Sequence, residues 1–376
     1  MTVRFNPLHS PSISGEGDPL TAPAEAKPPA RGFQLWLTAI LAVAGAAYLD
    51  VAWSDPIFQR AEDFLAECAR EMFALSRYIT PFMYDKPFID KPILSYWGME
   101  ASFAFLGVSH FSARLPSALA ALLTALLTAR AVARIWGRKE GLVAALVLCS
   151  SFGFFYFATL AMSDMWLTLC SAAAAAWFFA GSLNESRRTR EWTVAAVFCA
   201  LAVLAKGPIG LIFPAATCLL YLAIRSELGQ IRTRHALIAS AVVGVLAGGW
   251  FAFLWVQTGG TLLRQFFLEE NLRRFAGATY QANTHQPFGY IPLAFLLYFL
   301  PHSFCLPLAL VASVRKWRAG WNSPESRAEL FLWCYIVVVV GFFWAARSVS
   351  DYYVLPAMPA CACSCLCSVG FFWPAP

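Results

Sequence analysis

The chain has 376 residues, of which 59% are hydrophobic and only 13% are charged, and its formal net charge is +6. A soluble domain usually carries about a quarter charged residues, so this composition excludes a soluble globular enzyme, a disordered chain and a nucleic-acid-binding protein. Many of the eleven cysteines lie inside apolar runs, where cysteine behaves as a small hydrophobic residue. The composition predicts an all-α integral membrane protein.

The first thirty residues are rich in proline and in small polar residues, a composition typical of a disordered tail. We expect a cytoplasmic tail over 1–32 and one transmembrane domain over 33–376. A span needs about 20 apolar residues, and the run 192–205 is short by this measure. The sequence predicts about ten transmembrane helices, over 33–53, 115–133, 141–160, 164–183, 192–205, 208–224, 236–258, 288–313, 330–346 and 354–373.

Basic residues follow every second predicted span, which is the pattern of cytoplasmic loops. They are Arg130, Arg134, Arg138 and Lys139, then Arg187, Arg188 and Arg190, then Arg225, Arg232 and Arg234, then Arg315, Lys316, Arg318 and Arg327. This alternation places the N-terminus inside and two long segments, 54–111 and 259–287, on the outer face. It also requires that 94–111 lies on the membrane surface as a helix and does not cross.

The outer segment 54–111 begins with a helical pattern over 61–76. Its apolar face consists of Phe64, Leu65, Cys68, Met72 and Leu75, and acidic residues that include Glu62 and Asp63 occupy the rest. Such a helix is equally typical of an amphipathic juxtamembrane segment with a solvated charged face. Next comes Asp-Lys-Pro twice, ending in Asp90-Lys91-Pro92. Proline holds the preceding lysine extended, and the alternative is an ordinary proline turn with a surface ion pair.

Three further outer positions carry ionisable residues beside predicted spans, where such groups are functional candidates. Asp164 begins a span, and a helix cap is its structural alternative. Lys206 stands between two spans beside Gly207 and Pro208, and snorkelling to lipid headgroups is its alternative. The segment 259–287 collects Arg274 and His285 among other polar residues.

Seven segments together resemble, in order, the motifs of the membrane glycosyltransferases of the aminoarabinose-transferase and protein-O-mannosyltransferase superfamily. The resemblance covers about residues 35–370. Its motifs are AEDFLAECAREM at 61–72, FIDKP at 88–92, SARLPS at 112–117, LAMSDM at 160–165, LAKGP at 204–208, the polar elements within 270–288, and VLPAMP at 354–359.

The resemblance implies a fold of the GT-C type, with many transmembrane helices and an outer cavity. It also implies an inverting glycosyltransferase of the bacterial inner membrane, acting at the outer face. The expected partners are membrane lipids, a polyprenyl-phosphate-linked sugar as donor, and a lipid or glycan as acceptor. The leaving phosphate needs cations, and the sequence offers Lys91, Lys206, Arg274 and Arg347. The resemblance further places a divalent metal, zinc or another, between Asp90 and His285.

One position departs from the family pattern. Residue 61 is alanine where the family has an aspartate, so Asp164, Glu62 and Asp63 are the remaining candidates for the catalytic carboxylate. The same alanine favours the main alternative, a catalytically silent relative that binds lipid-linked sugars or acts in assembly. A transporter is the third hypothesis. The chain also ends after the tenth predicted span, as expected of a shorter variant or of part of a longer protein.

Overall fold

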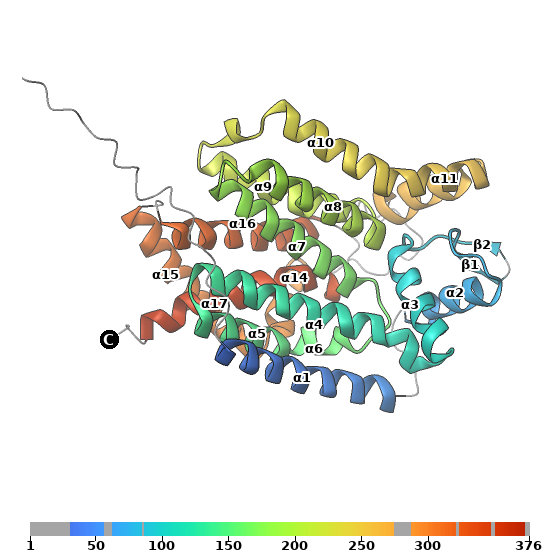
Figure 1. The fold of residues 1–376 in the computed structure, drawn as a ribbon, viewed down its shortest axis with the longest axis horizontal. Helices are drawn as coiled ribbons and strands as arrows, with labels where there is room; N and C mark the ends of the chain where they lie inside the picture. The colour runs from blue at the N-terminus through green and yellow to red at the C-terminus, as the bar shows by residue number, and fades with distance from the viewer. Residues whose placement is uncertain are drawn as a thin grey trace, which may run out of the picture.

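The computed structural model describes residues 31–55, 62–84, 86–273, 287–320, 323–346 and 350–372 (Figure 1). These residues are almost entirely helical, so the all-α prediction is confirmed. The β-structure in these ranges is one short antiparallel ladder of β1 (Phe82–Met83) and β2 (Lys86–Pro87). The predicted tail 1–32 lies almost wholly outside the described residues, and α1 begins at Arg31.

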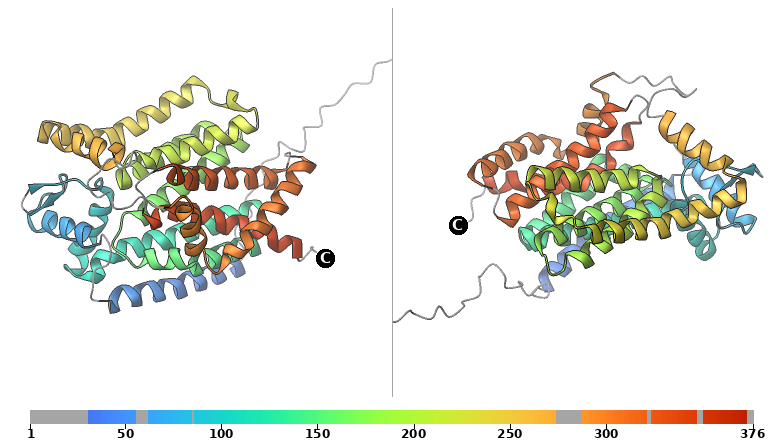
Figure 2. Two further views of the ribbon diagram at one scale, coloured as in Figure 1. Left: turned by 180° about the vertical axis from the view of Figure 1, so that it is seen from behind. Right: turned by 90° about the horizontal axis from the view of Figure 1, so that it is seen from above.

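Five stretches are long and apolar enough to cross a bilayer. They are α1 (Arg31–Ser54), α4 (His110–Ile135), α7 (Asp164–Leu183), α16 (Pro324–Ala345), and the continuous stretch Thr233–Thr258. The last consists of α10 (Thr233–Val243), the π-helical η2 (Gly244–Gly248) and α11 (Gly249–Thr258). Both views in Figure 2 show it along one side of the bundle.

Two predicted spans are bent pairs of helices, where the sequence predicted one continuous run each. In the first, α5 (Arg138–Ser150) and α6 (Phe152–Ala158) meet at 68°. In the second, α14 (Tyr290–Tyr298) meets η4 (His302–Phe304) and α15 (Cys305–Ala319) at 113°. The breaks are adjacent, and the N–H of Phe152 donates to the carbonyl of Leu300 over 2.8 Å. Each break therefore satisfies a backbone group that the other leaves open in apolar surroundings.

The other predicted runs are also helical, in α8 (Arg188–Lys206), α9 (Ile209–Ile224), and η5 (Asp351–Ala357) with α17 (Met358–Phe372). A short η1 (Leu228–Gln230) follows α9. Length and composition support five membrane spans, or seven if each bent pair is one span, within the described residues. For α8, α9 and α17, crossing the membrane stays a prediction.

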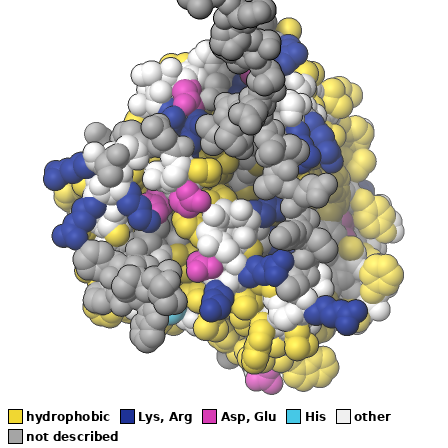
Figure 3. All heavy atoms as spheres, turned by 60° about the vertical axis from the view of Figure 1, so that its left-hand side comes forward, with side chains coloured by type: hydrophobic (Ala, Val, Ile, Leu, Met, Phe, Trp, Pro, Cys, Tyr) yellow, Lys and Arg dark blue, Asp and Glu magenta, His cyan; other side chains and the backbone are white. Residues whose placement is uncertain are grey.

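The two ends of the bundle differ in character (Figure 1). One end carries α2 (Glu62–Ala74), the β-ladder, α3 (Leu94–Leu106), α12 (Thr261–Arg264) and the π-helical η3 (Gln265–Arg273). With 13 residues, α3 is too short to cross a bilayer, in agreement with the predicted surface helix. The opposite end carries the α7–α8 and α9–α10 turns, and Figure 3 shows Lys and Arg side chains spread over it.

The two largest hydrophobic clusters among the described residues hold these parts together. The larger runs through α4 to α9, α14, α16, η5 and α17. The smaller lies beneath α2 and α3 and includes Leu65, Met72, Tyr96 and Phe266. At the basic end, Glu227 joins the α9–α10 connection to α16 by accepting from Arg327 over 2.6 Å. The smaller cluster thus anchors α2 and α3 at one end of the bundle.

Candidate active site

An ion pair between Asp164 and Lys206 lies where two neighbouring helices meet. Because α7 and α8 form an antiparallel hairpin, the start of α7 and the end of α8 lie side by side. Asp164 is the first residue of α7 and Lys206 the last of α8, and the Lys206 ammonium donates to the carboxylate. Both side chains are buried. Each charge sits at the helix end that its sign favours.

The pairing gives Asp164 a partner beyond its own helix. Within the described part of the chain, the carboxylate accepts its side-chain hydrogen bond from Lys206 and none from the backbone N–H groups of α7. A helix cap would need such a backbone bond. The geometry therefore favours a role in holding Lys206.

Two tyrosines of η5 complete the surroundings of Lys206. Its Nζ lies 5.2 Å from the ring centroid of Tyr352 and 4.5 Å from that of Tyr353, distances at which an aromatic face attracts a cation. Gly207 follows with φ +81°, and a Cβ there would stand 2.7 Å from the ring of Phe266. The glycine therefore both ends α8 and makes room for a ring that lines the adjoining cavity.

That cavity, the lysine pocket, has a volume of about 500 Å³. Its polar lining consists of Asp90, Lys91, Lys206, Asn271 and Tyr353, and its apolar lining of Pro208, Ile209, Ile212, Phe266, Phe267, Leu268, Leu272, Phe342, Phe343 and Ala346. Ile212 is 37% exposed and Leu272 61% exposed on the outside of the bundle. The cavity therefore joins two ammonium groups to an apolar cleft with an open side.

Lys91 and Asp90 are neighbours in this pocket as well as in sequence. The Lys91 ammonium donates to the Asp90 carboxylate over 2.8 Å, and both side chains are largely buried. Two of the four predicted phosphate ligands, Lys91 and Lys206, thus line one cavity. The other two, Arg274 and Arg347, lie outside the described residues.

Glu62 lies at the start of α2 and is fully buried. Its carboxylate accepts from the Arg114 guanidinium of α4 over 2.9 and 3.1 Å, and from the backbone N–H of Ala161 over 2.6 Å. Arg114 also donates to the carbonyl of Asp55 over 2.6 Å. These bonds fix the start of α2 to α4 and to the segment that leads into Asp164. The geometry favours a structural role for Glu62 over proton transfer.

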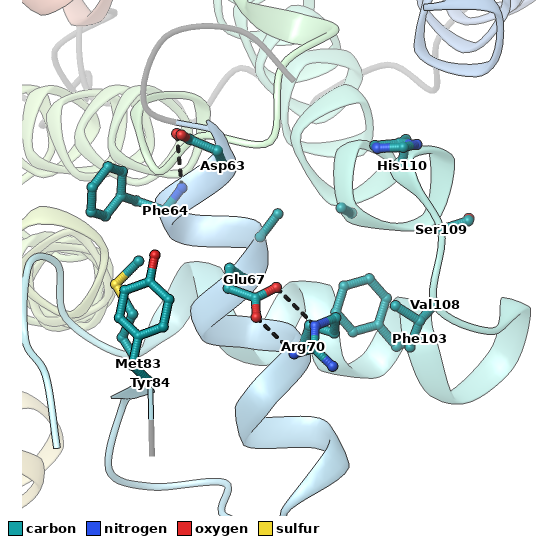
Figure 4. A pocket seen from close by; sticks show the side chains of 12 residues that line it. Asp63, Phe64, Glu67, Arg70, Met83, Tyr84, Phe103, Val108, Ser109 and His110 are labelled. Atoms are coloured by element: carbon teal, nitrogen blue, oxygen red, sulfur yellow. Dashed lines mark hydrogen bonds and ion pairs between the residues drawn. The ribbon is translucent and has the colours of Figure 1, made fainter. Parts of the chain in front are cut away.

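Asp63 faces a second cavity, the α2–α4 pocket, of about 570 Å³ (Figure 4). Its lining comes from α2, the β-ladder, the end of α3 and the start of α4, and consists of Asp63, Phe64, Ala66, Glu67, Arg70, Met83, Tyr84, Phe103, Val108, Ser109, His110 and Ala113. The Asp63 carboxylate accepts from the N–H of Phe64 over 2.9 Å. The three predicted carboxylates therefore occupy three different surroundings.

The predicted metal site depends on a residue that the structure does not describe. No group of three or more His, Cys, Asp or Glu side chains within the described ranges is arranged to hold a metal ion. Asp90 is paired with Lys91, and His285 lies outside the described residues. One described carboxylate does not make a metal centre, so a zinc or other divalent ion stays a prediction.

Several residues of the site were missed by the sequence analysis. Arg114 and the tyrosine pair Tyr352 and Tyr353 give the clearest examples. A signal existed for each: Arg114 stands between small and apolar residues near the start of a predicted span, and the tyrosines directly precede the VLPAMP segment. Neither pattern predicts which residue the side chain contacts.

Comparisons with known proteins agree on one family. The sequence profile described as dolichyl-phosphate-mannose-protein mannosyltransferase matches residues 90–251. Over 310 residues the chain is 29% identical to the undecaprenyl phosphate-alpha-4-amino-4-deoxy-L-arabinose arabinosyl transferase 2 of Proteus mirabilis, covering 80% of this chain and 53% of that protein. It is 30% identical to the corresponding transferase of Shewanella sediminis over 310 residues, covering 78% and 52%. The chain thus spans about half the length of the curated relatives it matches.

The fold has a counterpart among solved structures. The crystal structure of ArnT from Cupriavidus metallidurans bound to undecaprenyl phosphate matches with a TM-score of 0.77 and 22% identity, covering 90% of this chain and 60% of that one. This likeness shows the fold and confirms an all-α integral membrane protein. Over about half the length of these relatives the chain is therefore similar in sequence to the aminoarabinose transferases, and over residues 90–251 to the protein O-mannosyltransferases.

Proposed function

We propose that this chain is the membrane-embedded core of an inverting glycosyltransferase. Its donor is a sugar linked to polyprenyl phosphate, and its acceptor is a lipid or a glycan. The lysine pocket is the observation that supports this most strongly, because two ammonium groups adjoin an apolar cleft with an open side. A lipid phosphate has the same two parts, an anionic head and an apolar chain. The names of the relatives point to the same class of donor.

The transfer is a single displacement at the anomeric carbon. An oxygen of the acceptor forms a bond to that carbon while the bond from carbon to the phosphate oxygen breaks. The bonding electron pair leaves with polyprenyl phosphate, and the hydroxyl proton passes to a carboxylate. An ammonium carries three N–H donors, so Lys206 can hold Asp164 and still donate to the departing phosphate.

In this scheme the three carboxylates have different roles. Asp164 is a positioning residue that keeps the Lys206 ammonium turned toward the pocket, together with Tyr352 and Tyr353. Asp63 is our candidate for the general base, since its carboxylate lines a cavity, whereas that of Glu62 is enclosed by Arg114 and Ala161. No step in this scheme uses a metal ion.

The test measures binding and turnover separately, with full-length protein in lipid nanodiscs. Undecaprenyl phosphate should bind, and undecaprenol, which lacks the phosphate, should bind at least tenfold more weakly. A panel of radiolabelled polyprenyl-phosphate sugars then tests transfer. Binding without any transfer would favour the silent-relative alternative, to which Ala61 points. Equal binding of both lipids would refute the proposal.

We also propose that the active site faces the outside of the bacterial inner membrane and that the N-terminus is cytoplasmic. The basic turns lie at the end of the bundle opposite to α2 and α3 (Figures 1 and 3), which supports this orientation. In intact cells, a membrane-impermeant maleimide should label Lys86→Cys and miss Arg190→Cys, both at exposed positions. The reverse labelling would place the site on the cytoplasmic side.

A further inference from the structure

The α2–α4 pocket and the lysine pocket share no lining residue. Leu65, Cys68 and Met72 form the buried face of α2. These side chains belong to the smaller hydrophobic cluster, which also contains Tyr96 and Phe266, and Phe266 lines the lysine pocket. Asp63, Glu67 and Arg70 recur one helical turn apart on the opposite face and line the α2–α4 pocket. The helix α2 therefore presents its charged face to the α2–α4 pocket and its apolar face to the smaller hydrophobic cluster.

Two exposed aromatic rings stand at one side of this pocket. Phe64 is 47% exposed and Tyr84 is 74% exposed, and Figure 4 shows their rings on the same side, below Asp63. Phe64 belongs by sequence spacing to the apolar face of α2, but the structure leaves it open to the cavity. Exposed aromatic rings beside a cavity offer flat apolar surfaces, each with a positively polarised edge.

The backbone of Tyr84 is fixed against α2. Tyr84 has φ +52°, an uncommon conformation for a residue with a bulky side chain. Its N–H donates to the carboxylate of Glu71 over 2.9 Å, which fixes the residue against α2. The fold thus maintains a strained backbone at a residue whose ring remains in solvent.

The charges of the pocket are mainly acidic. Arg70 donates two hydrogen bonds to Glu67, over 2.8 and 2.7 Å, so the charge of that arginine is matched within the pocket. These bonds lower the pKa of Glu67 below its ordinary value, so it stays ionised. Asp63 adds a further carboxylate. Carboxylates accept hydrogen bonds from hydroxyl groups and repel phosphates.

We infer that the α2–α4 pocket binds the acceptor, and that this acceptor is a neutral glycan and not a phosphorylated sugar. A sugar ring presents C–H groups on its flat face, which fit against Phe64 and Tyr84, and hydroxyl groups, which fit Asp63 and Glu67. This inference rests on the proposed function, because only a sugar transferase needs such an acceptor.

The position of the pocket also suits an acceptor. Asp63 directly follows Glu62, whose carboxylate is bonded to the N–H of Ala161, three residues before Asp164. A glycan in the α2–α4 pocket therefore lies at the same end of the bundle as the donor phosphate site.

The test measures glycan binding directly, without donor, so that it does not depend on turnover. Purified full-length protein in detergent is applied to an array of neutral oligosaccharides and of the same oligosaccharides carrying a phosphate monoester. We expect binding to neutral members, at least tenfold tighter than to their phosphorylated counterparts. Phe64→Ala and Tyr84→Ala should each weaken it about tenfold. The matched control is Phe105→Ala, which removes an aromatic ring that is 88% exposed and does not line the pocket.

A second variant tests the role of charge. Glu67→Gln removes one carboxylate and leaves the charge of Arg70 unmatched, so binding of the phosphorylated members should rise about tenfold. The inference is overturned by binding to no member of the array, by preference for phosphorylated members in the wild type, or by equal effects of Phe64→Ala and Phe105→Ala. Failure of the proposed function appears elsewhere, as equal binding of undecaprenyl phosphate and undecaprenol.

Discussion

The lysine pocket and the α2–α4 pocket are similar in volume, about 500 and 570 Å³, but opposite in chemistry. The first joins ammonium groups to a cleft lined by bundle helices, and its aromatic rings hold a cation. The second is lined mainly by the polar end of the molecule, and its rings stand in solvent beside carboxylates. The contrast shows how one end of a helical bundle can offer a site suited to a lipid anion and another suited to a polar uncharged molecule.

The largest effect is expected from the charges of the lysine pocket. Lys206→Met and Asp164→Asn should each lower turnover about 10²–10⁴-fold. Each should also destabilise the fold by about 3–5 kcal/mol, because the remaining charge stays buried without its partner. The double variant should regain stability but not turnover, as measured by thermal denaturation in detergent and by sugar transfer.

Lys139→Met provides the control for this series, since Lys139 is an exposed lysine at the basic end of the bundle. It should leave both quantities unchanged. Wild-type turnover in Asp164→Asn would remove Asp164 from the active site and leave it a structural role.

The next effect concerns the ion pair at the start of α2. Glu62→Gln leaves the buried guanidinium of Arg114 without its carboxylate and should cost about 3–5 kcal/mol of stability. Because this pair fixes the start of α2, both pockets should lose affinity for their ligands together. Unchanged thermal stability with abolished turnover would instead assign Glu62 to catalysis.

A smaller effect should make ligand binding in the two pockets depend differently on pH. Glu100 of α3 is buried, and one of its carboxylate oxygens has no hydrogen-bond partner among the described residues. Burial raises its pKa from 4.5 to about 7. Between these values the folded chain binds more protons than the unfolded chain, so stability should fall as the pH rises, by up to about 3 kcal/mol.

Phe103 lies one turn after Glu100 and lines the α2–α4 pocket, so glycan binding should weaken over the same pH range while binding of undecaprenyl phosphate changes less. Denaturation curves from pH 4.5 to 8 measure the stability term. Glu100→Gln should flatten that dependence, and an unchanged slope in this variant would assign it to other groups.

The smallest effect is expected from the pair of Glu67 and Arg70. Both side chains are more than a third exposed, so Glu67→Gln should change stability by less than about 1 kcal/mol. The same variant should alter the preference for phosphorylated glycans. A large loss of stability would show that this pair supports the fold and would weaken its assignment to ligand binding.

Hydropathy was enough to predict where the helices lie, but it did not predict where they bend. The run 164–183 has the same bounds as α7, because a polar residue stands at each end. The runs 141–160 and 288–313 were predicted as single spans, but each contains a sharp break. An apolar segment is stable in the hydrocarbon of a bilayer whether its helix is straight or bent, so hydropathy does not distinguish the two. The bond from Phe152 to Leu300 that stabilises both breaks joins residues 148 positions apart.

The candidate site was predictable in its residue types but not in its pairings. Charge alternation placed Asp164 and Lys206 on one face, and the structure brings them into contact. By contrast, Glu62 and Asp63 are adjacent in sequence and were grouped as equivalent candidates, yet a rotation of about 100° along the helix buries one against Arg114 and opens the other to a cavity. Such differences depend on which helix packs against which face.

The exposed side of the lysine pocket has a kinetic consequence. Ile212, in the apolar helix α9, is exposed at this side, and in the proposed function this side opens to the hydrocarbon of the membrane. A donor that enters there diffuses in two dimensions, so the quantity that governs its encounter rate is its mole fraction in the bilayer and not its bulk concentration. Diluting the donor with added phospholipid should slow turnover even when the amount of donor in the tube is constant. A water-soluble glycan acceptor would show no such surface dilution.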